Sequence, residues 1–527
     1  MLRSTLLRLA LFASLSVACV PQDAAAGLEG GANANDRTKG GAQGETLLTG
    51  AMTISPRGDY VFAQRNAVSV IYDLGKKTFT ELDFQPTRFV FSPKAAFGYA
   101  LATDGSVVGV DLATGKKAWQ STPMAKVSLL RVSADDRSIV QGDDHQIRVL
   151  DAASGAVRTS EELGGVASFA AFLPSANKVL VASDTRFTDH KPETKVLVVD
   201  LSGLTPASRL AVPNCTAPIE VLPDETRAFL SPTFCAEDVP ANTTQTWTNP
   251  DPVSVIDLGA APTFVKNLPG FGPVAMPADG GRVVAYLDMQ RIDASMFADP
   301  KQIPSKDGPQ YHLMVIDPKS LAFSLTPIGN ALPRFALSRD GKGLLVDASI
   351  KVKTRVKAKA AATLTIGPSG VSGQVSAEAT VFQEKSPFGW FDLSTRAFTA
   401  FSGPMAGLDR FVQPSEGPVV TLMRRTDGLG GDAFTIDLGV KSTQAIAVGV
   451  ANSGLRDVGL LPDGKTVAFR LRLTASNKSS KLYSREALCL SLDLGKTCAA
   501  GYIEYEAKVP FADADPEGSC PGGHDCW

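Results

Sequence analysis

Apolar and polar residues alternate in short runs from residue 46 to about residue 510, and a polar turn follows each run. Some turns precede an apolar strand, as at 55–61 (SPRGDYV) and 461–467 (LPDGKTV). Other strands alternate and end in Asp, as at 68–74 (VSVIYDL) and 253–258 (VSVIDL). Such turns favour hairpins, because Asp bonds nearby backbone N–H groups and Gly accepts a positive φ. The pattern predicts many short antiparallel strands.

The aspartate that ends the alternating strand recurs nine times, at intervals of 38 to 75 residues. Its positions are Asp73, Asp111, Asp151, Asp200, Asp257, Asp317, Asp392, Asp437 and Asp493. Each interval has room for four strands, and a four-stranded sheet buries both of its faces when it packs radially between two neighbours. We therefore expect an all-β fold, a single large β-propeller over 46–510 with about seven to nine four-stranded blades. The aspartates are interpreted as turn caps rather than as catalytic or metal-binding groups.

These turns and V-x-V-I-D strand ends resemble the YVTN and WD-repeat-like β-propeller superfamily over most of the chain. The resemblance implies the architecture and says little about function. The segment 109–119 (GVDLATGKKAW) is also similar to the tryptophan-docking repeat of quinone-cofactor dehydrogenases and of an outer-membrane assembly lipoprotein. That family carries the Trp in most blades, whereas Trp247, Trp390 and Trp527 stand outside equivalent motifs. A bound quinone is therefore not expected, nor is any other cofactor.

The longest interval contains an inserted hairpin at 351–386. Its cations occupy every second position: Lys351, Lys353, Arg355, Lys357 and Lys359. A period of two indicates a β-strand with one cationic face. A turn at 367–370 would close the hairpin in a register that sets Lys353 opposite Glu384. Two roles remain open: a lid lying on the propeller, or a projecting arm whose cations bind a partner such as an anionic polymer or lipid headgroups.

The first residues predict export. In a signal peptide at 1–18, Arg3 and Arg8 precede an apolar run that is too short to span a bilayer. The sequence 15–19 (LSVAC) resembles the bacterial lipobox, which implies that Cys19 is acylated and becomes the new N-terminus; 24–26 (AAA) offers a rival, ordinary cleavage site. Residues 19–45 are rich in Gly and Ala and predict a flexible tether. The residue after Cys19 is not the Asp of inner-membrane retention, so the resemblance implies an outer-membrane lipoprotein facing the periplasm or the cell surface.

Six cysteines remain after Cys19, and they form three local pairs. The expected disulfides are Cys215–Cys235, Cys489–Cys498 and Cys520–Cys526. The first two pairs are symmetric about a turn, and the third closes a small ring in a tail at 511–527. A zinc site is the alternative, but the C-x-x-C spacing is missing. The tail also begins like a calcium loop at 513–518, yet His524 stands where a bidentate Glu is required, so no metal is expected.

Composition argues against two classes of function, nucleic-acid binding and acid–base catalysis. The 527 residues carry a formal net charge of −2, which argues against a nucleic-acid partner. Only four histidines are present, which lowers the expectation of acid–base catalysis, and 367–371 (GPSGV) fails the G-x-S-x-G nucleophile pattern. We expect an envelope-anchored, non-catalytic propeller that binds or scaffolds an envelope protein or a polysaccharide. The alternative, which fold analogy alone supports, is a propeller enzyme of the lactonase, lyase or glycosidase type acting at the central channel.

Overall fold

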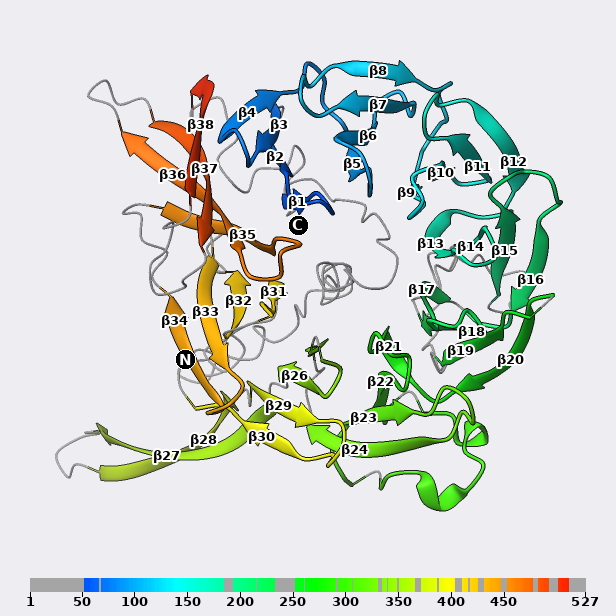
Figure 1. Ribbon diagram of the computed structural model, residues 1–527. Coiled ribbons are helices and arrows are strands. Elements are labelled where there is room, and N and C mark those ends of the chain that lie inside the picture. Colours follow the sequence, from blue (N-terminus) through cyan, green and yellow to red (C-terminus); the bar gives the residue numbers. More distant parts are fainter. Residues whose placement is uncertain are drawn as a thin grey trace, which may run out of the picture.

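The structure, a computed structural model, is a ring of antiparallel β-sheets (Figure 1). It describes residues 52–65, 68–183, 193–214, 216–232, 252–259, 261–290, 292–305, 307–329, 334–338, 340–347, 350–364, 371–385, 388–402, 410–415, 418–424, 431–446, 453–476, 482–491 and 501–510. The signal peptide, the tether and the C-terminal tail expected from the sequence lie outside these residues.

The described residues form nine blades of four strands. Seven sheets contain four strands each, and an eighth sheet of eight strands consists of two blades that the pair Gly431 and Leu455 joins. In each blade the strands pair in chain order from the first strand to the fourth. The expectation of an all-β propeller with four-stranded blades is confirmed, and the number of blades lies at the upper end of the expected range.

Blades 1 to 3 consist of β1 (Met52–Ile54), β2 (Tyr60–Arg65), β3 (Val68–Asp73) and β4 (Thr78–Glu81); β5 (Arg88–Phe91), β6 (Phe97–Leu101), β7 (Val107–Asp111) and β8 (Lys117–Gln120); and β9 (Leu129–Val132), β10 (Ser138–Gly142), β11 (Gln146–Asp151) and β12 (Val157–Glu162). Blades 4 to 6 consist of β13 (Ala167–Leu173), β14 (Lys178–Ser183), β15 (Thr194–Asp200) and β16 (Ser208–Val212); β17 (Thr216–Val221), β18 (Arg227–Pro232), β19 (Val253–Asp257) and β20 (Thr263–Leu268); and β21 (Phe271–Ala275), β22 (Val283–Asp288), β23 (Tyr311–Ile316) and β24 (Phe323–Gly329). Blades 7 to 9 consist of β25 (Arg334–Leu337), β26 (Gly343–Asp347), β29 (Phe388–Asp392) and β30 (Phe398–Ala400); β31 (Arg410–Val412), β32 (Val419–Arg424), β33 (Gly431–Asp437) and β34 (Ser442–Ile446); and β35 (Ser453–Leu460), β36 (Val467–Ser476), β37 (Leu482–Ser491) and β38 (Gly501–Pro510).

The core is divided among the blade interfaces. Within the described residues, nine buried hydrophobic clusters each lie between two neighbouring blades. On β2, Val61 packs in the cluster shared with blade 9, and Phe62 packs in the cluster shared with blade 2. Successive side chains of a strand point to opposite faces of the sheet, so a blade buried on both faces needs apolar residues at consecutive positions. This explains continuous apolar runs such as 179–182 (VLVA).

Among the described strands, the ring closes between blades 9 and 1 without strand exchange, because β1 pairs with β2 and β35 pairs with β36. The backbone N–H of Met52 donates a 2.7 Å hydrogen bond to Oδ2 of the buried Asp457. Nη2 of the buried Arg470 donates a 2.9 Å hydrogen bond to the carbonyl oxygen of Gln64. Met52 and Leu488 share the apolar cluster of this interface. Packing and buried polar bonds therefore join the two ends of the ring.

Trp119 on β8 links blade 2 to blade 3. Its ring lies against Gly155 in the β11–β12 turn, where a Cβ atom would be 2.4 Å from Cε3 of the indole. Gly155 has a φ of +72°, so glycine meets both the conformation and the close approach required here. Trp119 therefore packs across the interface between these two blades.

Two blades contain additional elements between their second and third strands. In blade 6, 289–310 includes the short 3₁₀ helices η3 (Ala294–Met296) and η4 (Pro300–Gln302). Phe297 packs edge-on against Phe323 of β24, with the two ring centroids 5.7 Å apart. In blade 7, β27 (Ile350–Leu364) and β28 (Val371–Lys385) pair with each other in a separate sheet. Figure 1 shows this ribbon leaving the ring beside β30. The expected inserted hairpin is confirmed.

Candidate partner-binding face

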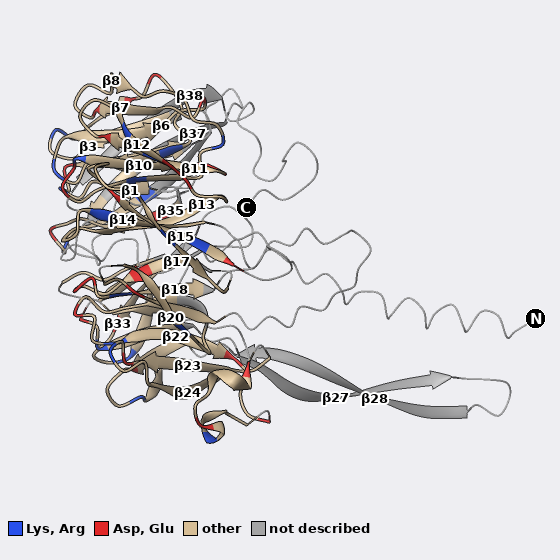
Figure 2. Ribbon diagram, turned by 90° about the vertical axis from the view of Figure 1, so that its right-hand side faces the viewer, with Lys and Arg blue, Asp and Glu red and all other residues tan. Residues whose placement is uncertain are grey.

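Antiparallel pairing gives the ring two different faces. One face, called the turn face here, holds the turns between strands 1 and 2 and between strands 3 and 4 of every blade. The opposite face, called the connection face, holds the segments between strands 2 and 3 and the links from one blade to the next. Figure 2 shows the ring from the side, with many charged residues of the turn face along one edge.

The recurrent aspartates cap the turns between strands 3 and 4. Oδ1 of Asp392 accepts hydrogen bonds from the backbone N–H groups of Ser394 and Thr395, both at 2.8 Å. Backbone N–H groups two or three residues downstream make equivalent bonds to the other described members of the set, which are Asp73, Asp111, Asp151, Asp200, Asp257, Asp317 and Asp437. Asp493 lies outside the described residues. The turn-cap interpretation is confirmed for the described aspartates.

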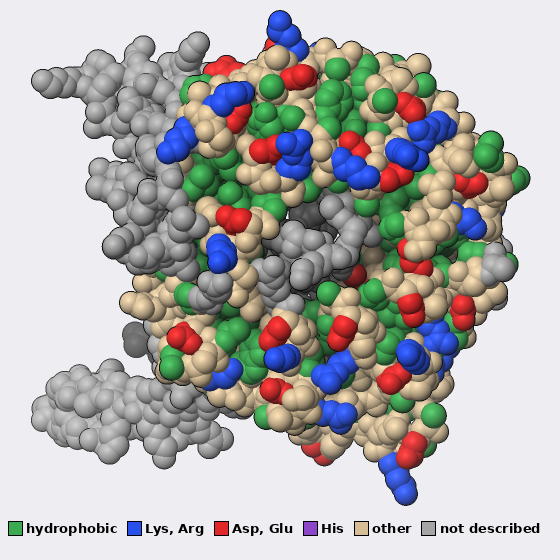
Figure 3. All heavy atoms as spheres, in the orientation of Figure 1, with side chains coloured by type: hydrophobic (Ala, Val, Ile, Leu, Met, Phe, Trp, Pro, Cys, Tyr) green, Lys and Arg blue, Asp and Glu red, His purple; other side chains and the backbone are tan. Residues whose placement is uncertain are grey.

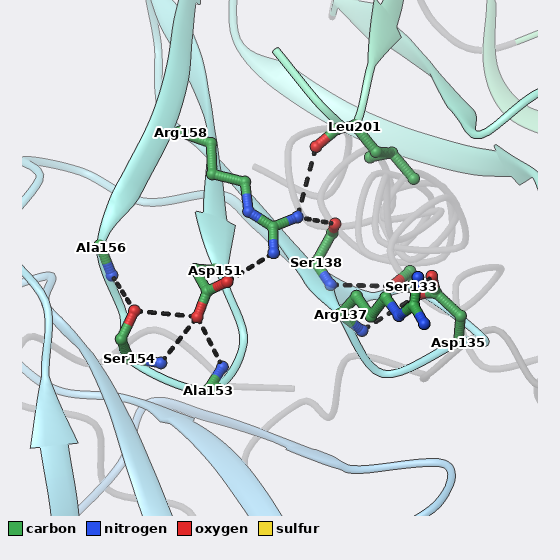
Figure 4. A network of polar contacts seen from close by, with 10 residues as sticks. All are labelled: Ser133, Asp135, Arg137, Ser138, Asp151, Ala153, Ser154, Ala156, Arg158 and Leu201. Atoms are coloured by element: carbon green, nitrogen blue, oxygen red, sulfur yellow. Dashed lines mark hydrogen bonds and ion pairs between the residues drawn. The ribbon is translucent and has the colours of Figure 1, made fainter. Parts of the chain in front are cut away.

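Hydrogen bonding keeps several of these carboxyl groups ionised. The Ser394 hydroxyl, with backbone N–H groups, lowers the pKa of Asp392 to about 2. Arg158 lowers the pKa of Asp151 (Figure 4). Its Nη2 donates to Asp151 Oδ2 at 2.5 Å, and its Nη1 donates to Ser138 Oγ at 2.9 Å. A carboxylate held this far below its ordinary pKa is a poor proton donor at neutral pH, so these groups suit turn capping better than acid–base chemistry.

The turns between strands 1 and 2 interlock around the ring. A Cβ atom on Gly280 of blade 6 would lie 2.4 Å from Cδ of Pro223 in blade 5, and Gly280 has a φ of +63°. Equivalent contacts between turns of adjacent blades are Pro277 against Gly341, Pro462 against Gly58, Ser92 Oγ to Asp136 at 2.5 Å, Ser175 N to Glu225 at 2.9 Å and Ser415 Oγ to the Gly464 carbonyl at 2.9 Å. In Figure 3, cationic and anionic side chains are interspersed on the turn face. The described turns of this face therefore contact the turns of adjacent blades.

The connection face differs from blade to blade. Strands 2 and 3 are joined through 66–67, 102–106 and 143–145 in the first three blades. The four following blades have much longer segments, at 184–193, 233–252, 289–310 and 348–387. Blades 8 and 9 return to short segments at 425–430 and 477–481. In these four consecutive blades more chain therefore separates strand 2 from strand 3, and the strand ends that it joins lie at the connection face; 184–192 and 233–251 lie outside the described residues.

In blade 6 a polar cluster fixes the two ends of a long segment. Nε2 of Gln310 donates to Oδ1 of Asp288 at 3.1 Å and to Oη of Tyr311 at 3.0 Å. The backbone N–H of Gln290 also donates to Asp288 Oδ1, at 2.9 Å. His312 is buried on β23 directly after these residues, and desolvation lowers its pKa. These bonds therefore tie the two ends of 289–310 to the strands, and burial favours the neutral form of His312.

His145 lies in an exposed loop. Its side chain is 77% exposed in the β10–β11 segment and lies 3.6 Å from Asp144, which also pairs with Lys126 at 3.2 Å. His190 and His524 lie outside the described residues. Where residues are described, no cluster of three or more His, Cys, Asp or Glu side chains could hold a metal ion. No helix in that same part of the chain is long and apolar enough to cross a membrane.

The residues expected to bind a partner, Lys351, Lys353, Arg355, Lys357 and Lys359, all lie on β27. The predicted register was wrong by two residues: Lys353 lies opposite Phe382, and Lys351 lies opposite Glu384. A shift of two keeps every residue on its predicted face, because side chains alternate with a period of two. The difference arises in the turn, since β27 ends at Leu364 and the turn is longer than the sequence indicated.

Cys19, Cys215, Cys235, Cys498, Cys520 and Cys526 lie outside the described residues. The hairpin that motivated the first disulfide is present, because β17 and β18 pair with Thr216 opposite Pro232. In blade 9, the backbone register sets Cys489 opposite Tyr502. Lipidation and all three disulfides therefore stay predictions.

Comparison with known proteins adds little beyond the architecture. No protein-family model and no curated protein matches the sequence. Among solved structures, the chain is similar to Kuenenia stuttgartiensis hydrazine synthase, with 16% identity and a TM-score of 0.35 over 56% of this chain and 91% of that chain. It is also similar to a chain of a mitotic checkpoint complex, with 13% identity and a TM-score of 0.34 over 44% and 70% of the two chains. Likenesses this remote carry no information about activity.

Proposed function

We propose that this protein is a non-catalytic propeller, anchored in the bacterial envelope, that binds a protein or polymer partner through its connection face. The observation that carries the proposal is that the strand ends joined by the long segments 184–193, 233–252, 289–310 and 348–387 all lie at that face. Binding residues commonly lie on loops that a rigid scaffold positions. The described turns of the turn face are short and their polar groups bond within the ring, so they offer less variable surface to a partner.

Blade 6 offers a matched pair of positions for the test. Gln290 and Ala278 are both exposed, and they lie beyond opposite ends of β22, on the connection face and the turn face respectively. A photo-crosslinking residue at each position, in the full chain expressed in its own envelope, should capture the partner from position 290 and not from position 278. Equal capture at both positions, or capture only from position 278, would contradict the proposal that the partner binds the connection face.

The anchor is proposed on the sequence at 1–45, with acylation at Cys19. One acyl chain gives weak membrane binding, whereas two give stable anchoring, so a diacylated Cys19 would retain the protein on membranes. Cys19→Ser should move the protein from the membrane fraction to the soluble fraction, while Cys235→Ser should leave the fractionation unchanged. An unmodified N-terminus after residue 26, found by mass spectrometry of the native protein, would contradict lipidation.

A further inference from the structure

The first strands of the blades carry an excess of arginine, and Figure 1 shows strands such as β5 and β9 nearest the centre of the ring. The charged residues of the nine first strands are Arg88, Arg131, Glu220, Arg334, Arg410, Arg456 and Asp457. One of the two acids, Asp457, is buried and accepts a hydrogen bond from the backbone N–H of Met52.

The fourth strands, at the rim, are balanced by comparison. Their charged residues are Lys117, Arg158, Arg209, Lys266 and Lys508 against Glu81, Glu161, Glu162, Glu504 and Glu506. The formal net charge of the whole chain is −2. Positive charge is therefore concentrated at the inner edge of the ring.

Arg88 and Arg131, on adjacent blades, show where this charge lies, and both side chains are half-buried. Nη1 of Arg88 donates a hydrogen bond to the carbonyl oxygen of Ser128, across the interface between blades 2 and 3. The backbone N–H of Ser128 in turn donates to the carbonyl oxygen of Gly142 at 2.9 Å, where β10 ends at the connection face. The guanidinium of Arg88 therefore lies at the connection-face end of the first strands, and Arg131 lies about 7 Å further along β9 than its first residue.

The chain that follows β38 has the complementary charge. Residues 511–527 contain four acidic residues and no Lys or Arg, and the four are Asp513, Asp515, Glu517 and Asp525. Strand β38 ends at Pro510, which lies opposite Tyr483 at the start of β37. The start of β37 is at the connection face, because the segment between strands 2 and 3 leads into it. The acidic segment therefore leaves the ring at the same face as the arginine that begins β5.

The acidic segment is long enough to reach both arginines. Paired strands lie about 4.8 Å apart, so three spacings separate β38 from β35 by about 14 Å. Packed sheets lie about 10 Å apart, so β5 and β9, two and three blades further, add at most about 20 and 30 Å. A fully extended chain advances about 3.4 Å per residue, which lets Glu517 lie up to about 24 Å from Pro510 and Asp525 up to about 50 Å. The long Glu and Arg side chains cover the rest of the distance between Glu517 and Arg88.

We infer that the acidic segment 513–525 docks across the connection-face end of the first strands, where its carboxylates pair with Arg88 and Arg131. Half-buried guanidinium groups are partly withdrawn from water, so they attract a carboxylate more strongly than an exposed lysine does. Because the segment belongs to the same chain, its effective concentration at the arginines is on the order of millimolar. The inference does not depend on the proposed function, but a docked segment covers the centre of the connection face, and an anionic partner that binds there has to displace it.

Modification of arginines by phenylglyoxal in the full chain tests the inference, with mass spectrometry giving the rate at each arginine. The test variant carries Asp513→Asn, Asp515→Asn, Glu517→Gln and Asp525→Asn. The control variant removes the same charge from exposed acids elsewhere, through Glu162→Gln, Asp279→Asn, Asp307→Asn and Asp340→Asn. A carboxylate paired with a guanidinium shields it, so Arg88 and Arg131 should react roughly threefold faster or more in the test variant, and at an unchanged rate in the control.

Two comparisons within the same experiment keep the result specific. Arg137 lies on the turn face with its side chain 81% exposed, and it should react equally fast in all three proteins. At about 1 M salt the Debye length falls to about 3 Å, so the difference between the unmodified protein and the test variant should shrink. Equal rates at Arg88 and Arg131 in these two proteins, or the same acceleration in the control variant, would overturn the inference. Circular dichroism confirms that each variant is folded.

A photo-crosslinking residue in place of Ala514 shows where the segment docks. It should attach to peptides that contain first strands of the same chain, and the attachment should fall when the four acidic residues are neutralised. Attachment to turn-face peptides, or to a second copy of the chain, would overturn docking within one chain. The crosslinker at position 290 reports on the partner separately, so failure of either experiment leaves the conclusion of the other standing.

Discussion

The turn face and the connection face are built on the same strands, yet their segments follow different rules. Around the turn face, the described turns between strands 3 and 4 keep an Asp cap from one blade to the next. On the connection face, the segment between strands 2 and 3 changes from 66–67 in blade 1 to 348–387 in blade 7. A turn that contacts the turn of the adjacent blade cannot grow without disturbing that contact. A segment without such a contact can lengthen, and the described turns of the turn face accordingly vary less in length than the segments between strands 2 and 3.

The largest effect is expected where a side chain is added at a close contact between turns of adjacent blades. Gly280→Ala should lower the free energy of unfolding by about 3 kcal/mol, because alanine is strained at a φ of +63° and its Cβ would lie 2.4 Å from Pro223. The adjacent Gly281→Ala is the matched control. A Cβ there meets only the carboxyl group of Asp279, at 3.4 Å or more, so we expect a change within about 0.5 kcal/mol.

Urea denaturation of both variants measures this effect. Pro223→Ala, introduced into the Gly280→Ala protein, should recover the part of the loss that the collision causes, and the strained backbone should account for the rest. Equal midpoints for Gly280→Ala and Gly281→Ala would show that the turns do not support one another across blades.

A smaller effect is expected at a single aspartate cap, and it depends on pH. The pKa of Asp392 falls from an ordinary 3.8 to about 2 in the folded protein. Its contribution to stability is therefore fully present above about pH 4 and is lost as the pH falls through about 2. Asp392→Asn should cost about 1 kcal/mol at pH 7 and should unfold with less dependence on pH between 4 and 2.

Urea midpoints at pH 7, 4 and 2.5 provide the measurement for the cap. Ser394→Ala removes the largest cause of the lowered pKa, and it should shift the loss of stability to higher pH. The same pH dependence in all three proteins would mean that this carboxylate does not contribute as a cap.

On the connection face, we expect the deletion of the inserted hairpin to have the smallest effect on stability. Removing 352–385 and joining the ends with a short Gly linker should alter the free energy of unfolding by less than about 1 kcal/mol. The reason is that β26 and β29 pair directly, with Asp347 opposite Phe388, and the ribbon forms its own sheet. Binding of the partner should be lost. A clear fall in the melting temperature would favour the lid role over the projecting arm.

Much of the ring could be predicted from sequence because each blade repeats its own signals. The alternating strand and its terminal Asp are local, and eight of the nine aspartates are found as turn caps among the described residues. The ribbon register was wrong by two because apolar and cationic faces match equally well after any even shift. The closing pair of bonds at Asp457 and Arg470 was missed, since it joins residues about 400 positions apart and no local pattern marks it.

The closure without strand exchange has a consequence for how such a gene can change. Every blade is encoded by one uninterrupted stretch, and no strand of the first stretch is needed to complete the last blade. A duplication or deletion of a whole stretch therefore adds or removes a complete blade, and the recombination points coincide with the links between blades. In a ring closed by an exchanged strand, the first and last coding segments would have to remain matched. Here each blade can be duplicated or deleted as a complete unit by unequal crossing-over, and this process changes the number of blades in the ring.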